Sequence, residues 1–292
     1  MARLSVPCNT RNLRGTMLHF VFTIDGDWGE YFDISLSEEE RAPKKETLQD
    51  LIRSEIKLTG QTLEGRFIHF IHTSPRARDF FLESHFLKLW KEILKNDGDV
   101  GLHCHEDDPY RHYYCQDTSR MKRVISEQVK IFRNAGLSLN CYRGGFLGFS
   151  SEMVRILEAN DIYFDFSCEP GRFLTHEGSV ISDWRGAPQR HYRMSYDNHR
   201  KPGHSKVWEI PVGASEGKYL YFEKISLGEI EKIGHDLKEI SIKNKCDIIV
   251  SVLSHTYEYS SLDKIQRIEE KIVLLKKYGA FINLKELQGI IS

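Results

Sequence analysis

The stretch MLHFVFTIDGDW, residues 17–28, decides the fold, because it joins a buried strand to a pair of carboxylates. Residues 17–25 form a nearly continuous apolar run of strand length, which is typical of a strand buried on both faces. Asp25 and Asp27 end this run with one glycine between them. Side chains at positions i and i+2 of a strand share a face, so both carboxylates are predicted to point the same way. A plain Asp-Gly turn is the alternative explanation.

Short apolar runs and amphipathic stretches alternate along the rest of the chain in the same way. We expect further strands at residues 66–73, 99–105, 139–143, 162–166, 207–212, 247–253 and 280–283. Helices are predicted at residues 80–94, from Ser119 to Gly136, from Ser150 through Leu157, and from Leu262 to Gly279. Roughly seven strand–helix units predict a parallel α/β sheet covered by helices and favour a closed barrel over an open sheet. We expect one domain, residues 1–292, with its core at about residues 17–290.

The composition excludes several classes of function. Lys and Arg number 41 and Asp and Glu 42, so the net charge of −1 provides no field for recruiting nucleic acid or an anionic membrane. The six cysteines are scattered without a CxxC pair, which indicates reduced thiols. No run approaches 18 apolar residues, and no signal peptide or P-loop is recognisable. We therefore expect a cytoplasmic protein with no nucleic-acid partner and no integral membrane segment.

In a barrel of this kind the chemistry lies at the carboxyl ends of the strands, so the residues that end the other predicted strands are the next candidates. His103 and His105 end the third predicted strand on one shared face, and two imidazoles so placed can bind Zn²⁺ or another divalent ion. Arg143 ends the fourth and can orient a carboxylate through two parallel hydrogen bonds. His255 follows a later strand, that at residues 247–253.

Together these strand ends supply what metal-assisted hydrolysis requires. Asp and His side chains can hold a divalent ion with one position open, where the ion lowers the pKa of a bound water to about 7. A carboxylate left off the ion can take a proton, and a separate His can give one to the leaving group, each typically contributing about 10²–10⁴-fold. Backbone N–H groups beside the ion can hold an oxyanion. A serine hydrolase is disfavoured, because the sequence has no GxSxG motif.

The strand-end motifs resemble those of the polysaccharide deacetylase family, also called the NodB-homology or carbohydrate esterase 4 family, over residues 22–287. The four matching motifs are Thr23-Ile24-Asp25-Gly26-Asp27-Trp28, Gly101-Leu102-His103-Cys104-His105, Tyr142-Arg143-Gly144-Gly145-Phe146 and Leu253-Ser254-His255. The resemblance implies a distorted (β/α)7 barrel of parallel strands with outer helices. It also implies that Asp25 is the catalytic base, that Arg143 orients it, and that His255 is the general acid.

The resemblance further implies one divalent metal ion, with zinc favoured, bound by Asp27, His103 and a third ligand. The family usually spaces its two His ligands at i and i+4, but residue 107 is Asp in this chain. Strand parity favours His105, because it shares the face of His103, whereas the family spacing favours Asp107. We assign His105 and keep Asp107 as the alternative, which would make a harder ligand set with a preference for another metal.

Residues 183–205 form a long polar, aromatic and basic segment that we interpret as a substrate loop, with a solvated loop as the alternative. Aromatic faces and charged donors typically bind saccharides, and arginine also binds phosphate. The residues assigned to substrate binding are Arg185, Tyr192 and Arg193 of this loop, with Trp28, Gly144, Gly145 and Phe146 at the strand ends. The predicted substrate is an amino sugar, with a nucleotide or a lipid phosphate as its carrier.

The leading hypothesis is removal of an N-acetyl group from an amino sugar during synthesis of a surface-glycan precursor, for O-antigen or capsule. Deformylation of a carrier-linked formamido sugar uses the same chemistry, and the sequence does not separate the two. The irregular second motif leaves open a third hypothesis, a non-catalytic barrel that binds a saccharide. The presence of Asp25, Arg143 and His255 together favours an enzyme, because a binding protein needs neither an acid nor a base.

Overall fold

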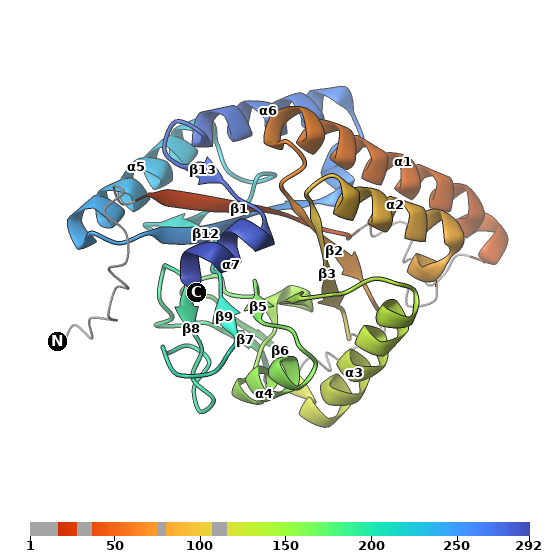
Figure 1. Ribbon diagram of the computed structural model, residues 1–292, viewed down its shortest axis with the longest axis horizontal. Coiled ribbons are helices and arrows are strands. Elements are labelled where there is room, and N and C mark those ends of the chain that lie inside the picture. Colours follow the sequence, from red (N-terminus) through yellow and green to blue (C-terminus); the bar gives the residue numbers. More distant parts are fainter. Residues whose placement is uncertain (1–16, 28–36, 75–79, 107–115) are drawn as a thin grey trace.

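The computed structural model describes residues 17–27, 37–74, 80–106 and 116–292 (Figure 1). Its centre is a curled sheet of parallel strands: β1 (Leu18–Asp25), β2 (Ile68–His72), β3 (Asp99–Cys104), β4 (Cys141–Gly144), β5 (Phe164–Asp165), β9 (Trp208–Glu209) and β12 (Ile248–His255). Hydrogen bonds join them in the order β12-β1-β2-β3-β4-β5-β9. Beyond β9, Val212 pairs in parallel with Ser251 of β12, so the sheet curls back to where the order begins. The expected distorted (β/α)7 barrel is confirmed.

Helices cover the outside of this sheet, as Figure 1 shows. They are α1 (Glu38–Leu63), α2 (Ser84–Lys95), α3 (Thr118–Asn134), α4 (Ser151–Ala159), α5 (Leu227–Asn244) and α6 (Leu262–Leu275). In α2, Phe86, Leu89, Trp90 and Ile93 recur at helical spacing and form one buried face against the sheet. The short strand β13 (Ala280–Phe281) pairs with β1, and α7 (Leu284–Ile291) follows it. No helix in the described ranges is both long and apolar enough to span a bilayer.

The crossover from β5 to β9 departs from the strand–helix pattern. It contains the antiparallel hairpin of β6 (Phe173–His176) and β7 (Ser179–Asp183), and then β8 (Tyr192–Arg193), which lies antiparallel to β9. A second ribbon, β10 (Ala214–Ser215) with β11 (Lys218–Tyr219), precedes α5. Short 3₁₀ turns are η1 (Phe80–Leu82), η3 (Gly145–Leu147) and η4 (Thr256–Tyr259). The predicted substrate loop is therefore built into the sheet and its flanking ribbons.

The two faces of the strands pack into different cores. Outward side chains of β1 such as Phe20 and Phe22 join the large core under the helices, whereas Val21 points inward to a smaller core along the barrel axis. Leu284 and Leu287 of α7 insert into this inner core at the amino end of the strands. The inward positions at the carboxyl end are polar or charged: Thr23, Asp25, His72, His103, Arg143 and His255. The barrel interior thus changes from apolar to charged along its axis.

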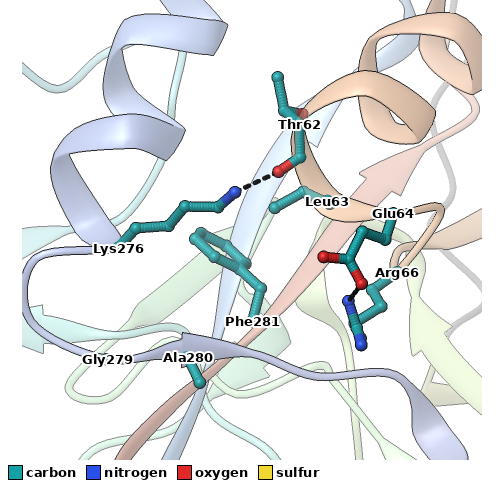
Figure 2. Close-up of a pocket in the computed structure, with 8 residues that line it drawn as sticks. All are labelled: Thr62, Leu63, Glu64, Arg66, Lys276, Gly279, Ala280 and Phe281. Carbon is teal, nitrogen blue, oxygen red and sulfur yellow. Dashed lines mark hydrogen bonds and ion pairs between the residues drawn. The ribbon is translucent and has the colours of Figure 1, made fainter.

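The amino end of the barrel carries a pocket of about 290 Å³ between α1 and β13 (Figure 2). The charged side chains that line it already have partners. Arg66 pairs with Glu64 at 2.6 Å, and the Lys276 ammonium donates a hydrogen bond to the Thr62 carbonyl oxygen. The Lys276 contact joins the end of α1 to the segment before β13, so it stabilises the wall of the pocket.

Candidate metal centre and active site

Four side chains from three adjacent strands converge at the carboxyl end of the barrel. Asp27 follows β1, His72 ends β2, His103 lies in β3, and His105 directly follows β3. Each offers one nitrogen or oxygen atom, and these atoms all lie within 4.8 Å of one another. The strand register explains part of this convergence, since His72 and His103 are direct partners across β2 and β3. We call these four residues the His-Asp cluster; imidazole and carboxylate are the donors that divalent transition ions prefer.

His103 shows that the His-Asp cluster fits a cation. Its Nδ1 lies 3.0 Å from the Arg143 carbonyl oxygen, which can only accept a hydrogen bond, so Nδ1 carries a proton. Nε2 lies 3.4 Å from Asp27 Oδ1 and 3.8 Å from Asp25 Oδ2, and it is buried without a hydrogen-bond partner within the described residues. A lone pair that faces two carboxylates is repulsive unless a proton or a metal ion lies between them. Burial alone would lower the pKa of His103, but Asp25 and Asp27 outweigh it and raise that pKa.

Asp27 lies at the centre of the cluster. Its Oδ1 lies 2.6 Å from His72 Nδ1, and its Oδ2 lies 3.5 Å from His105 Nε2. Burial alone would raise the pKa of Asp27, but His105 and His103 hold it well below its usual range. Burial lowers the pKa of His72 to about 4 despite its contact with Asp27, so this imidazole is neutral near pH 7. Ionised carboxylate and neutral imidazole are the forms in which these side chains bind a metal.

Asp25 lies beside the cluster but is held by Arg143. The Nη1 of Arg143 donates to Asp25 Oδ1 at 2.6 Å and to the Thr23 hydroxyl at 3.0 Å, while Nε donates to the Phe166 carbonyl oxygen at 2.9 Å. The guanidinium is fully buried, and its Cζ stacks 4.7 Å from the centre of the Phe70 ring. Contacts on several sides fix the guanidinium, so Arg143 holds the Asp25 carboxylate in one orientation.

His255 ends β12 next to Asp25, its direct partner in the strand register. Its Nδ1 lies 2.8 Å from Glu223 Oε1, and its ring stacks on that of Tyr257 with the centroids 5.0 Å apart. Burial alone would lower the pKa of His255, but Glu223, with Asp25 and Asp27, raises it above the usual histidine value. His255 therefore keeps its proton to a higher pH than an ordinary histidine, which suits a general acid.

The loop after β4 packs against the ligand side of β3. Phe146 adopts a left-handed backbone with φ of 56°, and its ring lies edge-on to the His105 ring with centroids 4.8 Å apart. A Cβ at Gly145 would come within 2.8 Å of the Cys104 carbonyl oxygen and the His105 ring, so only glycine allows this approach. The Gly144 N–H donates to the Ser167 hydroxyl at 2.9 Å. That N–H group therefore has a hydrogen-bond partner within the protein.

A second buried pair of carboxyl groups lies on the outer face of the sheet. Asp165 of β5 and Glu209 of β9 are direct register partners, and both are fully buried. The Ser167 hydroxyl donates to Asp165 Oδ1 at 2.7 Å, and the Cys168 N–H donates to Glu209 Oε1 at 3.0 Å. Burial raises the pKa of both carboxyls, and Asp165 raises that of Glu209 further. Their surroundings therefore favour the protonated form over the charged one, most strongly at Glu209.

The remaining predicted substrate residues are not gathered around the His-Asp cluster. Tyr192 is 2% exposed, and its hydroxyl donates to the His199 carbonyl oxygen at 2.8 Å. The Arg193 guanidinium lies 5.1 Å from the ring of Trp208, the first residue of β9. In the strand register Arg193 lies opposite Trp208 and Tyr192 opposite Glu209 of β9, whereas the cluster is built from the carboxyl ends of β1–β3.

Three more positions complete the predicted set. Arg185 lies on the surface, where it pairs with Asp183 at 2.9 Å and its guanidinium lies 3.6 Å from the centre of the Phe173 ring. Trp28 and the alternative ligand Asp107 lie outside the described residues. The cluster thus contains Asp27, His103 and His105 as drawn from the sequence, and the alternative ligand stays a prediction.

His72 and Glu223 are site residues that the sequence argument missed. His72 stands at the end of the second predicted strand, so the strand-end argument applied to residues 66–73 would have found it. Glu223 carries no such signal, because it lies in the irregular segment after β11. That segment runs back beside β12, where the Phe222 N–H donates to the Leu253 carbonyl oxygen at 2.9 Å, and this places Glu223 against His255.

Comparisons by sequence and by structure give different results. No protein-family model matches the chain, and no curated protein does. Among solved structures, a provisionally assigned polysaccharide deacetylase from Mycobacterium smegmatis superposes with a TM-score of 0.64 at 9% identity, covering 98% of this chain and 94% of that one. The allantoinase PuuE gives a TM-score of 0.57 at 9% identity, with 91% and 86% covered. Another provisionally assigned polysaccharide deacetylase, from Pseudomonas aeruginosa PAO1, gives 0.51 at 8% identity, with 92% and 89% covered.

These likenesses establish the fold. The chain has the barrel of polysaccharide deacetylases along nearly its whole length, as the motif resemblance implied. An allantoinase shares the barrel to a similar degree, so the likeness does not select a substrate. Function has to be argued from the site.

Proposed function

We propose that this protein is a cytoplasmic, metal-dependent hydrolase that removes an N-acetyl group from an amino sugar during synthesis of a surface-glycan precursor, for O-antigen or capsule. One observation carries the proposal: Asp25, fixed by buried Arg143, and His255 stand on neighbouring strands beside a cluster of metal-binding side chains. A positioned carboxylate, a protonated imidazole and a cation site are what amide hydrolysis requires. The shared barrel of polysaccharide deacetylases supports the same conclusion.

Asp27, His103 and His105 would hold the ion, and His72 lies beside them. A divalent ion bound there supplies Lewis-acid polarisation of the amide carbonyl and of the attacking water. Zinc is the first ion to test, because the donor set is nitrogen and carboxylate oxygen.

The other residues handle the protons. Asp25 takes the proton of the attacking water, and Arg143 keeps the carboxylate turned toward it. His255 gives a proton to the amine nitrogen as the C–N bond breaks. Because Nδ1 of His255 faces Glu223, Nε2 is the nitrogen left to donate that proton. Each of these two proton transfers typically contributes about 10²–10⁴-fold to the rate.

The substrate we propose is an amino sugar carried on a nucleotide or a lipid phosphate. Phe146 and Tyr257, both partly exposed, offer aromatic faces beside His105 and His255. Aromatic rings suit the apolar faces of a sugar, so these two rings support the proposed class of substrate. Trp28 stays a residue predicted from the sequence to bind the substrate.

The test is hydrolysis of nucleotide-linked N-acetyl and N-formyl amino sugars by the metal-loaded protein, followed by assay of acetate and formate. Acetate release supports the proposal, and formate release alone would make the protein a deformylase. Asp25→Asn and His255→Ala should each lose about 10²–10⁴-fold in turnover while the metal stays bound. Wild-type rates in both variants would end this mechanism. Saccharide binding without release of either acid would favour a non-catalytic barrel.

A further inference from the structure

We infer that His72 is a fourth metal ligand, which makes the centre a three-histidine, one-aspartate site that keeps an open position only with an ion of five or more ligands. The inference rests on the proposed function, because an open position matters only if water or substrate must reach the ion. The ligand set predicted from the sequence consists of Asp27, His103 and His105 and does not include His72.

The position of His72 relative to Asp27 is the first support. Asp27 Oδ1 faces two nitrogen atoms, His72 Nδ1 at 2.6 Å and His103 Nε2 at 3.4 Å. Two donor atoms each about 2.1 Å from one ion lie about 3.0 Å apart in an octahedral shell and about 3.4 Å apart in a tetrahedral one, so the 3.4 Å between His103 Nε2 and Asp27 Oδ1 is close to the ligand spacing of either shell. The donor atoms of His72 and His105 lie within 4.8 Å of these two, so all four surround the same small volume.

The arrangement of the rings is the second support. The His72 and His105 rings stack nearly parallel, with centroids 4.6 Å apart and an angle of 14° between them. The His103 ring stands edge-on to His105 at 4.6 Å. Two parallel rings and one perpendicular ring direct their nitrogens toward the two oxygens of Asp27 from different strands. All three imidazoles are buried, so contact with solvent does not account for their presence at this site.

His72 has one alternative role, as a hydrogen-bond donor that orients Asp27 without touching the ion. Partners of this kind are common around metal sites, and their loss typically lowers metal affinity about 10–100-fold. Loss of a ligand lowers affinity at least as much, so affinity alone does not separate the two roles. The number of ligands around the ion does separate them.

The coordination number follows from the donor count. Four protein donors fill a tetrahedral shell, which is the pattern of structural zinc sites, whereas catalytic zinc sites use three and leave the fourth position to water. A catalytic ion in the His-Asp cluster therefore needs a fifth or sixth position. Divalent iron, cobalt, nickel and manganese accept such shells from imidazole and carboxylate more readily than zinc does.

The experiment uses Co²⁺ as the probe, because its visible absorption is intense in four-coordinate sites and weak in five- or six-coordinate ones. Full-length metal-free protein is titrated with Co²⁺ alone, as wild type, His72→Ala and His72→Gln. His235→Ala is the control, since this imidazole lies on α5 with 67% of its side chain exposed. We expect weak bands from the wild type and the control. His72→Ala should bind Co²⁺ at least about tenfold more weakly and show more intense bands, because one ligand has gone.

Two results would overturn the inference. Intense bands in the wild type would mean a closed four-coordinate site, and equal spectra of wild type and His72→Ala would mean that His72 is not a ligand. In the second case, binding that still depends on His103 leaves the proposed hydrolase intact. If the wild type binds no Co²⁺ at all, the proposed function fails together with the inference. His72→Gln keeps the side-chain size, so its spectrum answers the same question if His72→Ala does not fold.

Discussion

Two clusters in this barrel place a carboxylate where its charge is disfavoured, and their neighbours respond in opposite ways; Asp27 is partly exposed, whereas Asp165 and Glu209 are fully buried. Inside the barrel, Asp27 meets the imidazoles of His103 and His105, and its pKa lies well below the usual range. On the outer face, Asp165 meets Glu209, and burial together with the neighbouring carboxyl raises the pKa of Glu209 well above the usual range. The neighbours in the first cluster favour a bound cation, and those in the second favour protonation.

The partners of each carboxylate explain the difference. Burial disfavours every charge, so a buried carboxylate needs either positive partners or protonation. Inside the barrel the neighbouring strands contribute His and Arg side chains at their carboxyl ends, whereas β5 and β9 place two acids opposite each other. Burial of a carboxylate therefore does not identify a functional site; the charge of its neighbours does.

The largest expected effect separates the clusters by metal affinity. Asp27→Asn removes a ligand charge and should weaken metal binding by about 100-fold or more, since even supporting partners typically account for about 10–100-fold. Asp165 is not part of the His-Asp cluster, so Asp165→Asn should keep metal affinity within about threefold. Isothermal titration with Zn²⁺ or Co²⁺ measures both. Equal losses in the two variants would remove the distinction between the clusters.

The second prediction tests whether His255, at the end of β12, is the general acid. Glu223 raises the pKa of His255, so the acid form needed for turnover persists above the usual histidine pKa and is lost as the pH rises through the raised value. Glu223→Gln lowers this pKa, and the alkaline limb of the kcat profile should move to lower pH. Activity on that limb should fall about tenfold for each unit of displacement. A profile that keeps its alkaline limb while losing only amplitude would argue against His255 as the acid.

The third prediction concerns the proton of the outer cluster. Because the pKa of Glu209 is raised in the folded state, folding holds a proton that the unfolded chain releases above its ordinary carboxyl pKa. Stability from this proton is full below about pH 4 and is lost as the pH rises through the raised pKa. Between pH 5 and pH 8 the Glu209→Gln variant should therefore lose less free energy of unfolding than the wild type. The difference should be about 1.4 kcal/mol for each unit by which folding raises the pKa of Glu209. Urea unfolding at pH 5 and pH 8 measures this difference. Equal losses of unfolding free energy in the wild type and the variant would contradict a raised pKa at Glu209.

The smallest expected effect compares two aromatic-rich regions. Arg193 packs over Trp208 at the amino end of β9, so Arg193→Ala should leave KM within about twofold of the wild type. Phe146 contacts the His105 ring at the carboxyl end, and Phe146→Ala should raise KM about fivefold, equivalent to roughly 1 kcal/mol of lost aromatic contact. Steady-state kinetics give both constants. A large rise in KM for Arg193→Ala would instead support the predicted role of residues 183–205 in substrate binding.

Much of the barrel could be predicted from sequence, because its strands are short apolar runs. The expected run at 17–25 is β1, and that at 247–253 is the body of β12, since a strand buried on both faces needs apolar side chains throughout. Helices α1 and α5 were missed because their charged residues obscure the apolar spacing, although Ser37 and Ser226 begin them with capping boxes. The ribbons in the β5–β9 crossover are short and paired by contacts distant in sequence.

The site could be predicted only where the chemistry follows a regular strand. Asp25, Asp27, His103 and Arg143 all lie at strand ends, and the structure brings them together as expected. His72 also ends a strand, but it is not among the residues predicted from the sequence. Glu223 could not be found, because an irregular segment carries it to His255 and no periodicity records that path. The substrate loop was judged by its polar composition, which does not show that β8 would join the sheet.

The most direct test of the central claim is the metal content of protein purified without chelator, compared among wild type, His105→Ala and Asp107→Ala. The account predicts about one divalent ion per chain in the wild type, a large loss in His105→Ala and no change in Asp107→Ala. No bound ion in the wild type, even after incubation with excess Zn²⁺ or Co²⁺, would contradict the metal-dependent hydrolase proposed here. Loss confined to Asp107→Ala would contradict the ligand set on which the coordination argument rests.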